Sequence, residues 1–506
     1  ATGFDRDTPL GKTLAAFPVA PRFAKMLALS VQGGCLAYII AIVSSLSVQQ
    51  LFLEFHTEKQ SAFEGKDDAE QAKQGAKSKR DASGAAADWA GVTVRHDAED
   101  MAVDDADGSH GDVTDVEERK RKAALMKGLE AAKLRWSNRQ SDLLTNLRVV
   151  GGYVFALAAA EKTARRSIEA KRKRHVTNGT HRGTLDDSAE IKTAVDQAAA
   201  EFCRLNFVRA KAMTEVEDLI GQLCRIMLDM RESLQIQAGA ESKASSSSSL
   251  QRELEMLESA VGSGKHLMLK PPSDEQEVLL RQLITAGFVD RVARKIPRSL
   301  GAAGSGDKQK WHADHADDPL NGGLGAYQCT TLDEPVFIHP RSGLFPKEFQ
   351  PQYVCYHEIM RSTAQSSSAG KPYLKGVTAI QPEWLFLLAP ELCVQSRPLE
   401  TPAPKYDAAT DRVLCYVDVQ FSPPHSHVTW QLPVQTIEHP AGAERIRHFV
   451  RLFMEGKVFN KMLDIRPYLV GRTSSIPTEP SARVNALMAP FYKHAVDSKA
   501  TLLTLW

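Results

Sequence analysis

The sequence predicts a multidomain α+β protein, in which a largely helical first part is followed by a small β-barrel and an α/β extension. Apolar residues recur at helical spacing between residues 35 and 227, and short β-branched or aromatic runs follow from Glu334. From Val413 the pattern is first strand-like and then helical. A chain of 506 residues is also too long for one core, because domains typically span roughly 100–200 residues.

Composition and charge are those of an ordinary globular protein. Hydrophobic residues make up 43% and charged residues 25%, and 63 basic residues nearly balance 62 acidic ones. Global charge therefore argues neither for nor against nucleic acid, and only local basic segments are informative. The seven cysteines are scattered without a C-x-x-C pair, which favours reduced thiols over a disulfide framework or a zinc ribbon.

No segment is expected to cross a membrane or to direct secretion. The longest apolar stretch, Cys35–Ser47, is shorter than the roughly 20 residues that span a bilayer, so it predicts a buried helix. No basic-then-apolar signal peptide follows Ala1. Because the sequence starts without Met, we expect that upstream residues are missing.

Three segments within the helical part have compositions that predict disorder. Residues 57–118 are rich in Asp, Glu, Lys, Ala and Gly, residues 164–189 hold a dense basic run, and residues 237–253 include Ser245–Ser249. The basic run, Lys171–His175, could contact RNA or direct nuclear import, or it could simply keep a loop soluble. A further loose loop, at residues 299–325, precedes the strands.

Several motifs resemble the C-terminal region of DEAH-box (DEAH/RHA) RNA helicases, and they occur in the order of that family. They are TPLGKTLAAFPVAPRFAKMLAL (Thr8–Leu29), SDLL (Ser141–Leu144), FCRLNFVRAK (Phe202–Lys211), LLRQLITAGFVDRVAR (Leu279–Arg294), FIHPRSGLF (Phe337–Phe345) and KPYLKGVTAIQPEWL (Lys371–Leu385). The resemblance implies that residues 1–29 end a winged-helix domain and that residues 30–286 form a ratchet-like helical bundle. It further implies an OB-fold β-barrel at residues 287–400 and a C-terminal α/β extension at 401–506.

A narrower resemblance links the chain to the nucleolar DEAH-box helicases of small-ribosomal-subunit assembly. It depends on PYLKGVTAIQPEWL, on SRPLETPAPKYD (Ser396–Asp407) and on the α/β tail. The resemblance implies an RNA-binding part of an ATP-dependent helicase that remodels pre-rRNA in ribosome biogenesis, in the nucleus and nucleolus. Its implied partners are single-stranded RNA, pre-rRNA or small nucleolar RNA, ribosome-assembly proteins and an activating protein. The alternatives are a non-enzymatic scaffold in a ribosome precursor and the C-terminal part of a splicing DEAH helicase.

The sequence contains none of the motor motifs of that family. A G-x-x-x-x-G-K-[ST] loop, an Asp-Glu-Ala-His box and a Gln-Arg motif are all missing from it. The near match ending at Lys265-His266 has Ser259 in place of the first glycine and His266 in place of Ser or Thr, so we interpret it as a linker. We therefore expect no catalytic residue and no metal or cofactor site in this chain, with ATP and Mg²⁺ bound by motor domains.

Candidate RNA-binding residues follow from how OB-folds hold single strands, which combine a basic groove with aromatic faces for stacking. One group lies after the strand Val336–Ile338, and a second is expected to alternate along one strand and to share one face. A third group flanks the apolar stripe of the helical bundle, where a solvated helix face is the alternative. The candidates are His339, Arg341 and Ser342, then Lys371, Tyr373, Lys375 and Thr378, and finally Arg204, Arg209 and Lys211.

Overall fold

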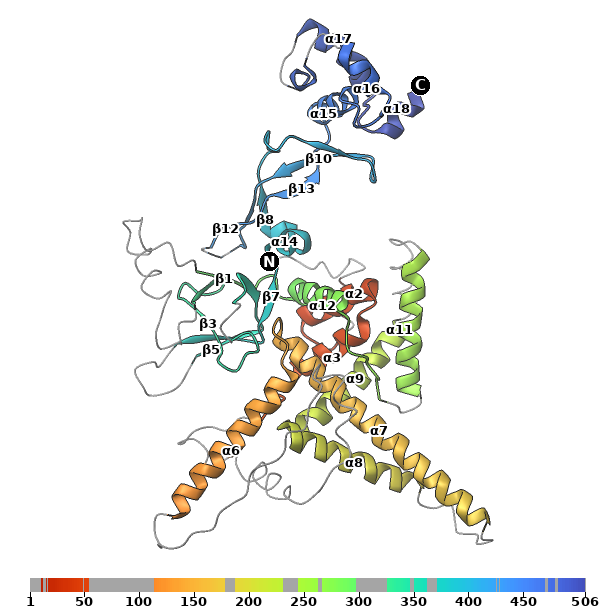
Figure 1. Cartoon of the computed structure of the whole chain (residues 1–506), viewed down its shortest axis with the longest axis vertical. Coiled ribbons are helices and arrows are strands. Elements are labelled where there is room, and N and C mark those ends of the chain that lie inside the picture. Colours follow the sequence, from red (N-terminus) through yellow and green to blue (C-terminus); the bar gives the residue numbers. More distant parts are fainter. Residues whose placement is uncertain are drawn as a thin grey trace. The chain divides into compact units, whose positions relative to one another are not determined.

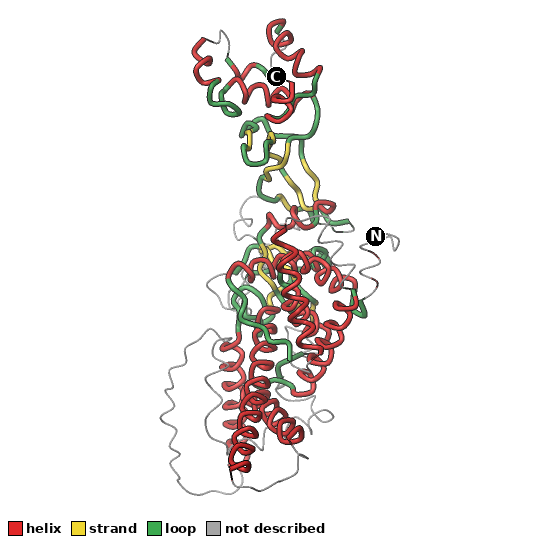
Figure 2. Tube along the Cα trace, turned by 90° about the vertical axis from the view of Figure 1, so that its right-hand side faces the viewer, coloured by secondary structure: helices red, strands yellow, loops and turns green. Residues whose placement is uncertain are grey.

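The computed structural model of the chain describes two compact units, Ala1–Ile380 and Gln381–Trp506 (Figure 1). Apart from a few single residues, it describes 17–53, 113–177, 187–230, 244–262, 266–296, 325–345, 350–361, 371–468, 472–477 and 481–505. The expected winged-helix end at residues 1–29 therefore falls largely outside the described residues, except for its last helix. In Figure 2, helices dominate the first unit and strands gather in one part of it, while the second unit combines strands and helices.

The first unit begins with a helical domain built around one helix that is apolar on all sides. This helix, α3, is packed against α2, α7, α9 and α11, as expected for a helix with no polar face. α2 starts with Pro21 in its first turn and stops at Gly34, whose φ of 64° suits glycine. The helices of this domain are α2 (Pro21–Gly33), α3 (Leu36–Ser47), α6 (Val113–Trp136), α7 (Asp142–Thr177), α8 (Asp187–Asn206), α9 (Ala210–Asp229), α11 (Ala244–Gly262) and α12 (Asp274–Gly287).

The prediction of disorder is wrong for parts of all three predicted segments. α6 already begins at Val113, α7 continues to Thr177, and α8 begins at Asp187. The serine run lies inside α11, because Leu250, Leu254 and Leu257 follow it at helical spacing and are all buried, at 2%, 0% and 0% exposure. The remaining residues of these segments, and residues 299–324 of the loop expected at 299–325, lie outside the described parts of the chain.

α7 is long and apolar enough, by length and composition, to cross a membrane over Asp142–Lys173. This is weak support for a span, since the core helix of a globular domain passes the same test. Its apolar residues from Leu143 to Leu157 pack inside the helical domain, with Leu147 fully buried. We interpret α7 as a core helix of this domain.

The strands of the first unit form two sheets over residues 292–380. Antiparallel strands in the order β2-β1-β4-β7 make a four-stranded sheet, and β3-β6-β5 make a three-stranded one, with β3 and β6 parallel. The bridge Tyr327–Val336 links the sheets, but the described strands do not close into the barrel that the sequence predicted. The strands are β1 (Val292–Lys295), β2 (Tyr327–Cys329), β3 (Phe337–Ile338), β4 (Tyr353–Cys355), β5 (Glu358–Arg361), β6 (Pro372–Lys375) and β7 (Thr378–Ile380).

Within this unit, the start of α7 is bonded to the sheets through one carboxylate. Asp142 accepts hydrogen bonds from the Ser342 hydroxyl at 2.8 Å and from the backbone N–H groups of Gly343 and Val377, each at 2.9 Å. The Ser141 hydroxyl lies 2.7 Å from that of Thr378. These bonds fix the loop after β3 and the start of β7 against the helical domain.

The second unit confirms the predicted change from strands to helices at Ala443. Two three-stranded sheets, β13-β10-β9 and β12-β11-β8, precede helices that share a core around Phe449, Val450 and Phe491. Its helices are α14 (Pro382–Leu388), α15 (Ala443–Met454), α16 (Met462–Ile465), α17 (Ala482–Lys493) and α18 (Lys499–Leu505). Its strands are β8 (Cys393–Gln395), β9 (Lys405–Asp407), β10 (Arg412–Val417), β11 (Val419–Phe421), β12 (Trp430–Gln431) and β13 (Gln435–Glu438).

Candidate nucleic-acid interface

The outer face of the β3-β6-β5 sheet carries a row of apolar and aromatic side chains. Tyr373 on β6 is paired with Phe337 on β3 and with Met360 on β5, so these three side chains point to the same face. The opposite face carries Leu374, which is fully buried in the core. The rings of Phe337 and Tyr373 lie 6.4 Å apart at 54°. Phe337 itself is only 4% exposed, in a small cluster with Ile296 and Ala326, and Tyr373 packs against this cluster with part of its ring exposed.

A histidine extends this row beyond the end of β3. The His339 ring meets Tyr373 edge-on, with centroids 5.7 Å apart at 77°. Its Nδ1 atom accepts a hydrogen bond of 3.1 Å from the backbone N–H of Arg341. The backbone N–H of His339 donates a hydrogen bond to the Leu374 carbonyl. The turn therefore holds the imidazole in place, and the Arg341 side chain beside it is exposed.

Two lysines flank the aromatic row, and they differ in their surroundings. The ammonium of Lys371 lies 5.5 Å from the centre of the Phe337 ring, which is a cation–π contact. The ammonium of Lys375 instead lies 3.0 Å from Glu358 Oε1 on β5. An incoming phosphate would have to compete with that carboxylate for Lys375. Lys371 and Lys375 both remain candidates for a phosphate contact.

Thr378 and Ser342 do not lie on this face, so for these two residues the predicted grouping is wrong. Gly376, at a φ of 63°, turns the chain between β6 and β7, so the alternation along KPYLKGVT does not continue to Thr378. Thr378 is fully buried and Ser342 is 9% exposed. Both hydroxyls instead contact the start of α7, at Ser141 and Asp142. The SDLL motif (Ser141–Leu144) indicated only a polar cap before an apolar helix, and it did not indicate that Ser342 and Thr378 contact this cap.

The carboxylate of Asp142 is enclosed although the residue as a whole is partly exposed. Loss of hydration raises the pKa of Asp142, and the hydrogen bonds from Val377, Gly343 and Ser342 act in the opposite direction. The residue also lies in the first turn of α7, where the helix dipole favours a negative charge. We interpret this cluster as the structural support of the loop that carries His339 and Arg341.

The three bundle candidates lie at the α8–α9 corner, away from the strands of this face. Arg204 is in the last turn of α8, and Lys211 is exposed in the first turn of α9. Arg209 precedes α9, and its backbone N–H donates a 2.8 Å hydrogen bond to the Leu51 carbonyl. The corner between them is formed by Phe207 at a φ of 53°. The structure thus separates these residues from the sheet candidates.

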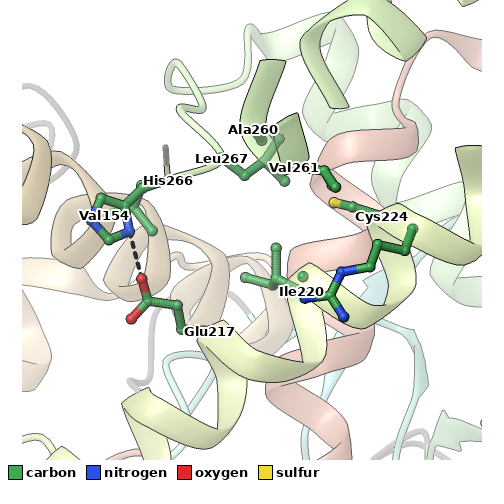
Figure 3. Close-up of a pocket in the computed structure, with 10 residues that line it drawn as sticks. Val154, Glu217, Ile220, Cys224, Ala260, Val261, His266 and Leu267 are labelled. Atoms are coloured by element: carbon green, nitrogen blue, oxygen red, sulfur yellow. Dashed lines mark ion pairs between the residues drawn. The ribbon is translucent and has the colours of Figure 1, made fainter. Parts of the chain in front are cut away.

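A cavity of about 210 Å³ lies within the helical domain, between α7, α9 and the end of α11 (Figure 3). Among its lining residues, His266 Nδ1 lies 2.5 Å from Glu217 Oε1, and this hydrogen bond raises the pKa of His266. The near match to a phosphate loop ends at this histidine, and its residues 263–265 lie outside the described chain. His266 is therefore engaged by a carboxylate, which does not favour a bound phosphate there.

The part of the chain that the structure describes holds no cluster of metal-ligating side chains. No group of three or more His, Cys, Asp or Glu side chains is placed there to hold an ion. The seven cysteines are free, and burial raises the pKa of Cys203 and Cys224 to about 12, which leaves their thiols unreactive near neutral pH.

Comparison with known proteins matches two segments of the chain to described families. Residues 20–146 match the helicase associated domain (HA2), ratchet-like, and residues 280–392 match the oligonucleotide/oligosaccharide-binding (OB)-fold. The first segment lies in the helical domain, and the second contains both sheets of the first unit. The order of the two matches along the chain is that of the predicted bundle and OB-fold.

Curated relatives align along nearly the whole chain. The probable ATP-dependent RNA helicase DHX37 of Homo sapiens is 28% identical over 99% of this chain and 31% of its own length. The probable ATP-dependent RNA helicase kurz of Drosophila melanogaster is 28% identical over 97% of this chain and 29% of its own. The ATP-dependent RNA helicase DEAH13 of Arabidopsis thaliana is 24% identical over 99% of this chain and 31% of its own length. The chain spans about a third of the length of these relatives. Together with the two matched domains, the relatives support a C-terminal region of a DEAH-box RNA helicase.

Proposed function

We propose that this chain is the RNA-binding region of an ATP-dependent DEAH-box RNA helicase, and that single-stranded RNA crosses the outer face of the β3-β6-β5 sheet. The observation that carries the proposal is the row of Phe337, Tyr373 and His339 with the Lys371 ammonium beside it. Aromatic faces stack bases without sequence preference, and adjacent cations neutralise the backbone. Tyr373 and His339 would stack bases, while Lys371 and Arg341 would contact phosphates.

ATP hydrolysis would belong to motor domains outside this chain. The support is that its relatives are named ATP-dependent RNA helicases, whereas this sequence holds no phosphate-binding loop. ATP and Mg²⁺ would be bound by those motor domains, and this region would guide the strand that the motor moves. Arg204, Arg209 and Lys211 remain candidates for contacts with the same strand on the helical domain.

The expected setting is ribosome biogenesis in the nucleolus, with pre-rRNA or small nucleolar RNA as substrate and ribosome-assembly proteins as partners. The support is the resemblance of PYLKGVTAIQPEWL and of the tail to the nucleolar group of this family. Crosslinking of the full-length protein to RNA in cells tests this setting. Recovery of spliceosomal RNA in place of pre-rRNA would favour the splicing alternative, and recovery of no RNA would favour the scaffold.

The proposed RNA face is tested by binding of a fluorescent oligo-uridine strand to Tyr373→Ala. Loss of one stacked base costs about 1–3 kcal/mol, so affinity should fall by about 5-fold to 150-fold. Tyr373→Phe keeps the ring and should bind nearly as the parent does. Tyr468→Ala removes a tyrosine that is 82% exposed in the second unit and serves as the matched control. Equal binding by Tyr373→Ala and the control would refute the assignment.

A further inference from the structure

α7 and α8 form a two-helix arm that extends from the helical domain (Figure 1). We define the arm as residues 158–177 of α7 and 187–201 of α8. Beyond Leu157, Ile168 is the one described α7 residue that is buried, at 7% exposure. Because so little of the arm is packed, its surface is set by charged and small side chains.

Some of the cations on the arm hold the helices together. The Lys171 ammonium lies 2.5 Å from Glu190 Oε1 on α8, and Arg172 is paired with Asp187. These interhelical ion pairs account for two residues of the basic run. Arg165 is paired within α7, at 2.6 Å from Glu161 Oε1.

Lys162 and Arg166 have no such role. Both are exposed, and the structure gives neither side chain an ion pair or a hydrogen bond among the residues it describes. They are four residues apart, so they lie on one face of α7, on the side away from Ile168. Like charges at this spacing destabilise a helix by roughly 0.2–0.5 kcal/mol. A local conflict of this kind is typical of a functional surface, because the missing counter-charge then comes from a ligand.

The chemistry of this face favours phosphate groups over a protein partner. Protein interfaces depend on buried aromatic or large apolar anchors, and no large apolar side chain is exposed on the described arm. Ala159, Thr163 and Ala170 are small neighbours of these cations, and the charged neighbours Arg165 and Glu169 are paired with Glu161 and Lys173. A straight helix with small side chains can approach a row of phosphates closely, and binding of this kind is electrostatic and independent of sequence.

The same face is unsuited to a single strand. Single-strand sites stack bases on aromatic rings, and the described outer face of the arm offers none. Double-stranded RNA is instead recognised by its shape and its backbone. We propose that the outer face of the arm, through Lys162 and Arg166, binds the phosphate backbone of double-stranded RNA. This site is separate from the β3-β6-β5 face, and either one could exist without the other.

The test compares the full chain with Lys162→Gln/Arg166→Gln in binding to an RNA duplex of about 16 base pairs, the length that small duplex-binding domains span. Arg483→Gln/Lys493→Gln removes two exposed cations from α17 and serves as the control with matched charge. At about 0.1 M salt, duplex affinity of the arm variant should fall about tenfold or more. The slope of log affinity against log salt should decrease in magnitude by about 1 for each of the two cations removed. The control variant should match the parent.

Oligo-uridine binding, measured on the same proteins, separates this proposal from the one for the sheet. An arm variant that loses duplex binding and keeps oligo-uridine binding supports a duplex site on the arm. Unchanged duplex binding overturns the proposal, as does an equal loss for both RNA forms. Lys162→Arg/Arg166→Lys, which keeps both charges, should restore duplex binding, and failure to do so would also count against a phosphate contact.

Discussion

Asp142 shows how a single residue couples the two domains of the first unit. Its carboxylate accepts from the Ser342 hydroxyl and from the N–H groups of Gly343 and Val377, which belong to two different connections of the sheets. The Ser141 hydroxyl adds a contact to Thr378. Removing an acceptor leaves donors without partners, and each such donor costs about 1–3 kcal/mol.

Asp142→Ala should therefore destabilise the first unit by about 3 kcal/mol or more. Thermal melting measured by circular dichroism checks this. Asp187→Ala breaks only the exposed pair with Arg172 and should cost under about 1 kcal/mol. If the two variants melted alike, the Asp142 cluster would not be the junction described above.

Lys371 and Lys375 should both contribute to RNA binding. Lys371 lies on the Phe337 ring, whereas Lys375 is paired with Glu358 at 3.0 Å. Each phosphate contact on a single strand contributes roughly 0.7 to the slope of log affinity against log salt, so losing both lysines would lower the slope by at most roughly 1.4. Lys371→Ala and Lys375→Ala should each lower the slope by at most roughly 0.7, as measured with oligo-uridine at three salt concentrations.

The control for these lysines is Lys499→Ala, in the second unit. Its ammonium lies 5.0 Å from the centre of the Phe459 ring, so it makes the same kind of contact as Lys371. The Lys499→Ala variant should show the same slope of log affinity against log salt as the parent protein. An unchanged slope in Lys371→Ala would remove this lysine from the RNA face.

Glu253 gives stability a pH dependence. Burial raises its pKa to about 7, although the N–H groups of Leu36 and Ala37 favour its charged form. A carboxyl whose folded pKa is raised stabilises the fold fully below its unfolded pKa, and this contribution is lost as pH rises through the folded value. Melting temperature should therefore fall between about pH 4.5 and 7, and Glu253→Gln should flatten that fall. A variant that kept the full slope would contradict this origin.

At the scale of elements, α3 could be predicted from sequence because its apolar residues mark a buried helix. The second half of α7 and the start of α11 could not. Both segments are polar, and the residues that keep them helical lie elsewhere in the sequence. The second half of α7 is held by ion pairs to carboxylates on α8. The start of α11 is held by buried residues such as Leu254, which lie beyond the serine run. Composition alone does not distinguish such segments from disordered ones.

Ile168 is the element-scale test of the arm, because it is the buried α7 residue beyond Leu157. Replacing a buried Ile by Ala typically costs about 2–5 kcal/mol, and here that loss would fall on the arm. Amide exchange over residues 158–173 should become faster in Ile168→Ala, while the helical domain keeps its melting temperature. Ile465→Ala, at a position 49% exposed in α16, is the control and should leave exchange in the arm unchanged.

At the scale of the whole molecule, domain order was predictable and the detailed site was not. Motif order fixed the succession of helical domain, OB-fold and α/β tail, and the matches at 20–146 and 280–392 follow it. Phe337 was not among the candidates, because its place beside Tyr373 depends on the parallel pairing of β3 with β6. Likewise, Thr378 was misplaced because one glycine turn ends the strand. Strand pairing is a long-range feature that a local pattern does not contain, whereas Gly376 was a local signal within the strand pattern.

The chain as a whole should not hydrolyse ATP, with or without RNA. Phosphoryl transfer needs a loop that cradles the phosphates, a magnesium-binding hydroxyl and an acidic residue for the metal, and the sequence offers none of these as a set. The nearest segment ends at His266, which is held by Glu217. Release of inorganic phosphate should equal that of a no-protein blank, both with and without oligo-uridine. RNA-stimulated release that disappeared in Lys265→Ala would show that this segment is a true phosphate site, and the division between motor and RNA-binding region would then be wrong.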